Sequence, residues 1–171
     1  MNLFDEMQQR ENTAPYERLA RKALTAYGLE QARIELVSRA EHALFRVSDR
    51  EAKTAYALRI SSRGGDRRAI LRTLLWLASL RRQGCRSVPE PIVTRGGHLI
   101  QSLSTPGVSG FRLVTLVDWL RGRVAPVAEW TADRALHLGR EIAKVHRRAE
   151  SGDVGLSRAP YAQDVSSLEQ Q

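Results

Sequence analysis

Cysteine and long apolar runs are both scarce in this sequence of 171 residues. The single cysteine, Cys85, cannot form an intrachain disulfide, which favours a reducing compartment. No uninterrupted apolar run approaches the roughly 20 residues that cross a bilayer, and the first residues lack a basic region followed by an apolar one. We therefore expect a soluble, cytoplasmic protein with no membrane partner.

Several catalytic signatures are absent as well. The sequence contains no P-loop pattern, no Gly-x-Ser-x-Gly elbow and no His and Cys residues at zinc-binding spacing. Support is therefore lacking for P-loop nucleotide hydrolases, for serine hydrolases of that type and for zinc proteins.

Positive charge is in excess, with 27 Lys and Arg residues against 19 Asp and Glu residues and a net charge of +8. A basic balance makes nucleic acid a partner to consider. The arginines, however, are spread over every predicted element, and aromatic residues that could stack on bases make up only 6% of the chain. Scattered arginines are typical of solvated helix faces, so we do not expect a nucleic-acid partner.

Hydrophobic periodicity predicts an α+β fold that opens with a helix and three strands. The first helix is expected to begin at a Thr13 cap, to have Pro15 in its first turn and to end at Gly28. Alternation of apolar and polar residues then predicts antiparallel strands at residues 34–38, 44–47 and 54–60.

A second helix is predicted after a charged break at residues 61–65. Asp66 is expected to cap this helix, and leucines at helical spacing carry it to Gln83. It must pack on the sheet through an apolar face that includes Ile70, Leu74 and Leu77.

Further strands are predicted on both sides of a turn at residues 94–97. They are Ile92-Val93 and His98-Leu99-Ile100, and Pro89 and Pro91 favour an extended path into the first of them.

The rest of the chain is predicted to hold a loop, a buried strand and a long helix. Residues 102–110 contain Pro106 and two glycines and are predicted to be the loop, and the apolar run 113–117 suits the strand. Thr131 is expected to cap the helix, which extends to about Glu150. The last twenty residues are predicted to form a loose polar tail.

The order of these elements, together with five short segments, resembles the aminoglycoside phosphotransferase family, which also includes choline-kinase-like and homoserine-kinase-like proteins. The segments are Tyr56-Ala57-Leu58-Arg59-Ile60, Leu75-Trp76-Leu77-Ala78-Ser79-Leu80, Val88-Pro89-Glu90-Pro91, Leu116-Val117-Asp118-Trp119-Leu120-Arg121-Gly122 and Ile142-Ala143-Lys144-Val145-His146. The resemblance implies a protein-kinase-like small lobe in residues 1–116, a five-stranded antiparallel sheet with one packed helix. Residues 117–171 would hold a hinge, the first helix of an incomplete large lobe and the tail. By this likeness, members transfer the γ-phosphoryl group of ATP or GTP to a small-molecule hydroxyl with the help of Mg²⁺.

The resemblance and the strand pattern together nominate Arg59 as the residue that binds nucleotide phosphates. A cation at the end of the third strand can offset phosphate charge. An edge-strand arginine that points into solvent is the alternative. The helix that follows has Thr73 where related sites have a glutamate, so the usual ion pair is missing unless Glu41 or Asp66 replaces it.

Six further residues are nominated as nucleotide contacts by their position alone. Ser38 and His42 flank the turn in the phosphate-covering position, although that turn has no glycine. His42 is expected to be a partly exposed turn residue and not a catalytic base. The hinge is expected at Leu116, Val117, Asp118 and Trp119, whose backbone groups would bond an adenine edge. A buried strand followed by an ordinary loop explains these four residues equally well.

No residue of the sequence is nominated as catalytic or as a metal ligand. The triplet His146-Arg147-Arg148 imitates a kinase catalytic loop, but it closes a predicted helix and has a cation where a carboxylate must accept the substrate proton. We therefore expect a truncated kinase with negligible turnover and an apolar surface that favours self-association. A non-catalytic nucleotide-binding module, an Arg-rich nucleic-acid binder and a truncated product without selected function stay open as alternatives.

Overall fold

The structure, a computed structural model, describes residues 3–123 and 125–150, with side chains from residue 13 to 123 and from 125 to 148. The expected polar tail lies outside these residues. The helices are α1 (Leu3–Thr25), α2 (Arg67–Arg82) and α3 (Ala132–Glu150), with a short 3-10 helix η1 (Val127–Glu129). The strands are β1 (Arg33–Arg39), β2 (Ala43–Asp49), β3 (Thr54–Ile60), β4 (Pro91–Ile92), β5 (Gln101–Thr105) and β6 (Val108–Asp118).

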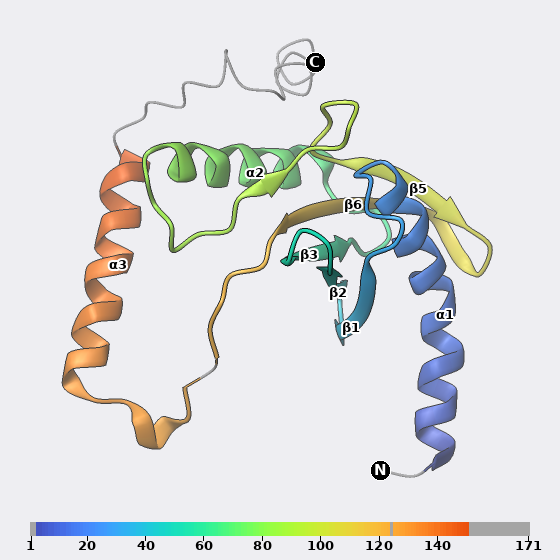
Figure 1. The fold of residues 1–171 in the computed structure, drawn as a ribbon, viewed down its shortest axis with the longest axis horizontal. Coiled ribbons are helices and arrows are strands. Elements are labelled where there is room, and N and C mark those ends of the chain that lie inside the picture. The colour runs from blue at the N-terminus through green and yellow to red at the C-terminus, as the bar shows by residue number, and fades with distance from the viewer. Residues whose placement is uncertain (1–2, 124, 151–171) are drawn as a thin grey trace.

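The strands form one antiparallel sheet in the order β1-β2-β3-β6-β4, and β5 pairs with the first part of β6. Figure 1 shows this sheet between α1 at the right and α3 at the left, with α2 crossing above it. The sheet therefore has six described strands, and the predicted five-stranded sheet is wrong.

The additional strand is β5, which forms a hairpin with β6 in the segment that the sequence analysis predicted to be a loop. Pro106 and Gly107 form its two-residue turn between the paired residues Thr105 and Val108, and Gly107 takes the positive φ of 86° that the turn requires. The loop prediction for residues 102–110 is therefore wrong. The strand predicted at residues 98–100 is also wrong, because β5 begins only at Gln101 and the buried residues Leu99 and Ile100 precede it.

Helix α1 covers one face of the sheet. Its fully buried side chains pack on the apolar residues of that face, Phe45, Val47, Leu58, Ile60, Val114 and Leu116. The helix begins ten residues before the predicted cap, so Thr13 lies inside it together with Pro15. A proline inside a helix removes one backbone hydrogen bond, and the packing of the following turns on the sheet offsets that loss.

Helix α2 covers part of the opposite face, as predicted. Asp66 caps it as expected, since its Oδ1 accepts hydrogen bonds from the backbone N–H groups of Arg68 at 2.8 Å and Ala69 at 3.1 Å. Its buried residues pack with Leu99 and Ile100 and with side chains of β6, and they are Leu71, Leu74, Leu75 and Ala78. The predicted contacts Ile70 and Leu77 are only partly buried.

Strand β6 is followed along the chain by η1 and then by α3 (Figure 1). The strand predicted at 113–117 is confirmed, and it continues past the expected domain boundary at residue 116. Thr131 caps α3 as predicted, because its Oγ1 accepts a hydrogen bond from the N–H of Arg134. Within the described chain, no helix is long and apolar enough to span a membrane.

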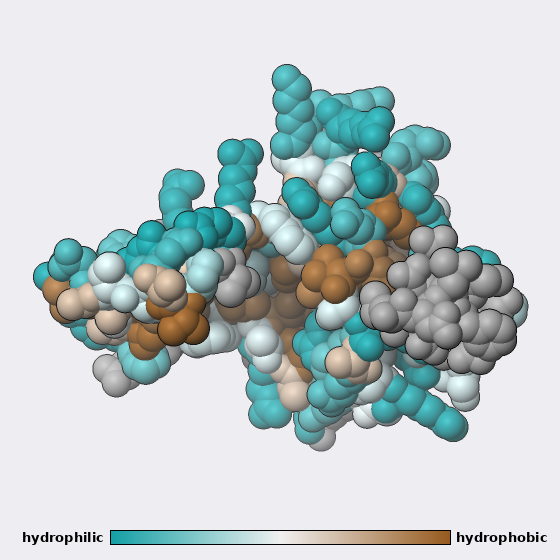
Figure 2. Space-filling model, turned by 90° about the horizontal axis from the view of Figure 1, so that it is seen from below, coloured by the Kyte–Doolittle hydropathy of each residue, from teal (hydrophilic) through white to brown (hydrophobic). Residues whose placement is uncertain are grey.

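Helix α3 stands away from the sheet and exposes apolar side chains. Leu136, Leu138 and Ile142 each expose between 44% and 53% of their surface, and the preceding Trp130 is similarly open. Figure 2 shows hydrophobic surface on this arm at the left of the molecule.

Candidate functional site

The nominated residue Arg59 lies on the face of the sheet that α2 partly covers. Strand pairing places Ser38, Leu44, Arg59 and Thr115 in one row across β1, β2, β3 and β6. Directly paired side chains share a face of a sheet. Leu113 and Val117, which have the same parity in β6 as Thr115, pack against the α2 cluster. We call this surface the α2-side face.

A β-bulge brings Ser38 to this face. The register of β1 against β2 shifts between Leu36 and Ser38, so Val37 has no partner and Ser38 pairs with Leu44. Because a shift of one residue reverses the face of every later side chain, the bulge turns Ser38 to the same side as Arg59. Ser38 is exposed and lies two strands away from Arg59.

Arg59 is a partly buried cation with no carboxylate partner among the described residues. Its Nη2 lies 2.5 Å from Nε2 of His42. Thr73, which stands where related sites have a glutamate, and the two possible substitutes Glu41 and Asp66 all make other contacts. Thr73 donates its hydroxyl to the carbonyl of Ala69, Asp66 caps α2, and Glu41 is 80% exposed beside His42. The positive charge of Arg59 is therefore not neutralised within this face.

His42 connects the β1–β2 turn to the end of β3. Its Nδ1 accepts a hydrogen bond of 3.1 Å from the backbone N–H of Ser62. Ser61 fixes that N–H, because Ser61 continues the pairing of β3 with β6 through its backbone N–H and its side-chain oxygen, both bonded to Leu113. The ring is 28% exposed, and it lies beside Arg59 instead of projecting into solvent.

The small residue Ala57 lies two positions before Arg59 in β3, on the same face of the sheet. Ala57 pairs with Arg46 on one side and with Val117 on the other, so these three side chains also belong to the α2-side face. Ala57 is partly buried and has the shortest side chain of the three, and we call its methyl group the floor of this row. The guanidinium of Arg46 lies 5.2 Å from the centre of the Trp119 ring, a cation–π contact that borders this floor.

Arg46 did not emerge from the sequence as a site residue. Its position in β2, two residues after Leu44, gives it the same face as Arg59 once the register is known. The alternation of β2 could have shown which face Arg46 occupies. The sequence alone, however, does not distinguish a strand arginine that borders a binding site from one that only faces solvent.

The four hinge candidates lie at the end of β6 and just beyond it. Leu116 is buried in the core under α1, whereas Val117 packs toward α2. The backbone N–H groups of Asp118 and Trp119 donate to the carbonyls of Glu90 and Ala55 at 2.9 and 3.0 Å. The chain leaves the sheet after Trp119.

Asp118 anchors this end of the strand to α2. Its carboxylate accepts hydrogen bonds from Nη2 of Arg81 at 3.1 Å and from the N–H of Glu90. The Arg81 guanidinium also bonds the more exposed carboxylate of Glu90. The exit from β6 is thus held by a charged network between α2 and the strand.

Two hollows of the surface lie away from Arg59. One of about 530 Å³ is formed by the end of α1, the turn at residues 94–98 and the start of β5. The other, of about 330 Å³, lies at the start of α3 beside Trp130. Neither of these two hollows is lined by Arg59 or His42.

The structure describes the segment that imitates a kinase catalytic loop, and it also bears on metal binding. His146, Arg147 and Arg148 lie in the last turns of α3, as predicted. Among the side chains of residues 13–123 and 125–148, no three His, Cys, Asp or Glu residues come together as a metal-binding group. No step through Mg²⁺ can therefore be assigned to the described residues.

Comparison with solved structures shows that the fold is kinase-like. An amicoumacin kinase in complex with AMP-PNP, Ca²⁺ and Ami aligns over 82% of this chain with a TM-score of 0.66 and 19% identity. A microcompartment-associated aminopropanol kinase aligns over 76% of the chain with a TM-score of 0.60 and 28% identity.

The aligned part covers only 42% and 39% of those two proteins, so this chain spans about two-fifths of their length. No protein-family model and no curated protein matches the sequence. The chain therefore shares its fold with small-molecule kinases, and the similarity extends no further than the fold.

Proposed function

We propose that this chain is the nucleotide-holding part of a kinase of the aminoglycoside phosphotransferase type, in which Arg59 binds the phosphates of ATP. The sheet and α2 would form the small lobe, and the end of β6 would form the hinge. Helix α3 would be the first helix of the large lobe. The single observation that carries this proposal is a partly buried guanidinium that no described carboxylate neutralises. A cation of this kind favours an anionic ligand.

The surroundings of Arg59 suit a nucleotide. The floor at Ala57, with Leu44 and Val117 beside it, offers an apolar surface for a flat base next to the phosphate-binding cation. We place the base edge against the backbone from Leu120 onward, because the N–H groups of Asp118 and Trp119 are bonded within the sheet. The AMP-PNP bound by the amicoumacin kinase supports a nucleotide as the ligand of this fold.

We further propose that these 171 residues do not transfer phosphate by themselves. Phosphoryl transfer depends on metal placement and on orientation of the nucleophile. Among the described side chains, no three His, Cys, Asp or Glu residues form a metal-binding group, and the sequence nominates no residue as the base that orients a nucleophile. The purified chain should therefore leave aminoglycosides, choline, homoserine, sugars, amicoumacin and aminopropanol unmodified in the presence of ATP and Mg²⁺. Substrate-dependent ATP consumption that Arg59→Ala abolishes would contradict this part of the proposal.

Calorimetric titration with ATP tests the binding proposal. Arg59→Ala should weaken binding by on the order of 1–3 kcal/mol, the scale of a lost charge-assisted hydrogen bond. Arg50→Ala is the matched control, because Arg50 is exposed in the β2–β3 turn at the other end of the same hairpin. Equal ATP affinity in the folded Arg59→Ala variant would rule out the proposed role. Salt-sensitive binding to arbitrary DNA or RNA, without a response to ATP, would favour the nucleic-acid-binding alternative.

A further inference from the structure

The ring of His42 faces hydrogen-bond donors on both of its nitrogens. Arg59 approaches Nε2, with its Nη2 at 2.5 Å, and the backbone N–H of Ser62 approaches Nδ1 at 3.1 Å. The two donors come from the end of β3 and from the loop that follows it, whereas His42 belongs to the β1–β2 turn.

One ring cannot satisfy both donors. A neutral imidazole has one acceptor nitrogen and one N–H, a protonated ring has no acceptor, and a guanidinium only donates. If Nδ1 accepts from Ser62, the hydrogen on Nε2 meets the guanidinium; if Nε2 accepts from Arg59, the hydrogen on Nδ1 meets the Ser62 N–H. In each tautomer one donor lacks an acceptor.

No other described group resolves this conflict. The nearest carboxylate is that of Glu41, whose Oε2 lies 4.0 Å from Nε2 and is too far for a hydrogen bond. Its side chain is 80% exposed, so water screens its charge. An anionic acceptor that draws the guanidinium of Arg59 away from Nε2 and accepts from both groups would satisfy every donor at once.

We propose that His42 is a positioning residue that aligns Arg59 and is completed by a phosphate oxygen of the nucleotide. This inference rests on the proposed nucleotide binding at Arg59. When the phosphate binds, Arg59 and the Nε2–H of His42 both donate to phosphate oxygens, and Nδ1 accepts from Ser62. The ring is then fixed in one tautomer, with the hydrogen on Nε2.

The proposal predicts that His42 recognises phosphate and not the base. His42→Leu should weaken ATP binding roughly tenfold, the scale of one hydrogen bond to a charged group, and should leave adenosine binding unchanged. His42→Gln should retain affinity within about threefold, because a glutamine amide can accept from one neighbour and donate to another. Urea unfolding of both variants checks that the fold is intact.

The imidazole nitrogen spectrum gives a readout of the tautomer of His42 in the unmodified chain. The chain has four histidines, and His42→Gln identifies the His42 signals by their loss. Saturation with ATP should drive the ring to the tautomer that carries its hydrogen on Nε2, and adenosine should not.

The outcomes separate the two proposals. ATP binding that depends on Arg59, together with a His42 spectrum that ATP leaves unchanged, would overturn the role of His42 alone. Equal loss of ATP and adenosine affinity in His42→Leu would also overturn it, because the residue would then only maintain the turn. Absence of ATP binding to the unmodified chain would overturn the proposed function and this inference together.

Discussion

Arg59 shows how far a single residue of the site could be predicted from the sequence. Its place at the end of a strand followed from the alternation of residues 54–60 and is confirmed. Its contact with His42 could not be predicted, because the two residues are 17 positions apart and meet only when the β1–β2 turn folds toward β3. The expected substitutes for a missing glutamate, Glu41 and Asp66, do not pair with it.

Tyr27 provides a pH-dependent test of packing at the end of α1. Burial raises the pKa of its hydroxyl to about 12, against a smaller lowering influence of Gln101. The phenol oxygen itself is buried. Because the pKa is higher in the folded than in the unfolded chain, folding favours the protonated phenol. This contribution is complete below pH 10 and is lost as the pH rises toward 12.

We expect the free energy of unfolding to fall by up to about 2–3 kcal/mol between pH 10 and 12 on account of Tyr27. Tyr27→Phe, which has no ionisable group there, should lose less stability over that interval. Urea denaturation at several pH values measures the difference, and Tyr16→Phe is the control. Tyr16 is partly buried against the core under α1, and the guanidinium of Arg39 lies over its ring. Parallel stability curves for the unmodified chain and Tyr27→Phe would contradict the assignment.

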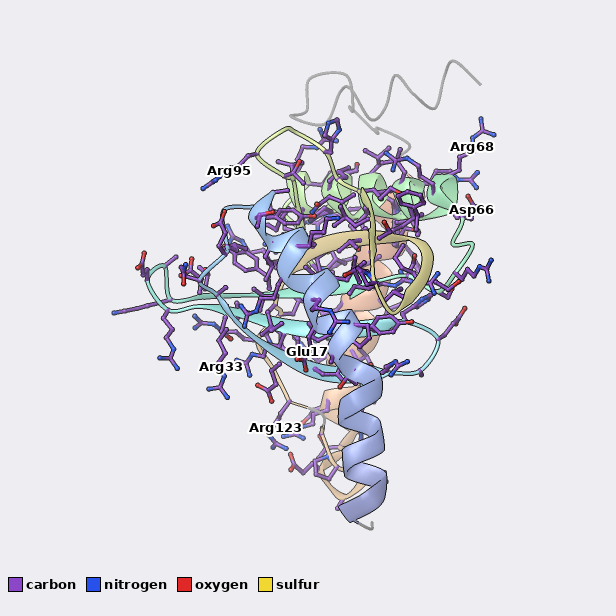
Figure 3. All side chains as sticks on the ribbon, turned by 90° about the vertical axis from the view of Figure 1, so that its right-hand side faces the viewer. Glu17, Arg33, Asp66, Arg68, Arg95 and Arg123 are labelled. Atoms are coloured by element: carbon purple, nitrogen blue, oxygen red, sulfur yellow. The ribbon has the colours of Figure 1, made fainter. Side chains whose placement is uncertain are left out.

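At the scale of elements, α2 was predictable because its signals are local. Asp66 precedes leucines at helical spacing, and both the cap and the packed face follow from them. The cap also provides negative charge where the helix begins with Arg67 and Arg68, whose charges are unfavourable at the positive end of the helix dipole. Figure 3 shows Asp66 and Arg68 together at this end of α2.

Removal of this cap should destabilise the protein measurably. Asp66→Ala loses both hydrogen bonds to the first turn and should lower the free energy of unfolding by about 0.5–2 kcal/mol. Asp66→Asn keeps an acceptor and should lose only the charge interaction, about 0.3–1 kcal/mol. Thermal or urea unfolding measures both, with Glu51→Ala as the control for loss of an exposed carboxylate. An Asp66→Ala variant as stable as that control would show that the cap contributes nothing.

The sequence did not predict the β5–β6 hairpin, because its signals are those of a loop. Proline and glycine at 106, 107 and 110 break the alternation that reveals strands, and here they form a tight turn and the strand beside it instead of an open loop. The face of Ser38 was also beyond prediction, because it depends on the bulge at Val37, and a bulge leaves the sequence pattern almost unchanged.

For the whole molecule, the sequence predicted the α+β class and the order of its main elements, and the kinase-like fold of the structural neighbours agrees with both. The number of strands was wrong. The small-lobe description, the hinge and the expected self-association stay predictions. Self-association could use the exposed apolar residues of α3, because Leu138 and Ile142 lie on a helix that stands apart from the sheet (Figure 1).

The central claim is that the α2-side face, with Arg59 at its edge, binds a nucleotide. The two faces of the sheet can be distinguished by their methyl groups. Leu44, Ala57 and Val117 lie on the α2-side face and are only partly buried. Val47, Leu58 and Leu116 are packed in the core under α1.

Methyl NMR spectra recorded during titration with AMP-PNP test this claim most directly. The account predicts that the methyl signals of Leu44, Ala57 and Val117 shift in proportion to occupancy and that Arg59→Ala reduces these shifts at equal ligand concentration. The signals of the core under α1 should remain in place. Shifts confined to that core or to the hollow at the start of β5, or shifts that are identical in Arg59→Ala, would contradict it.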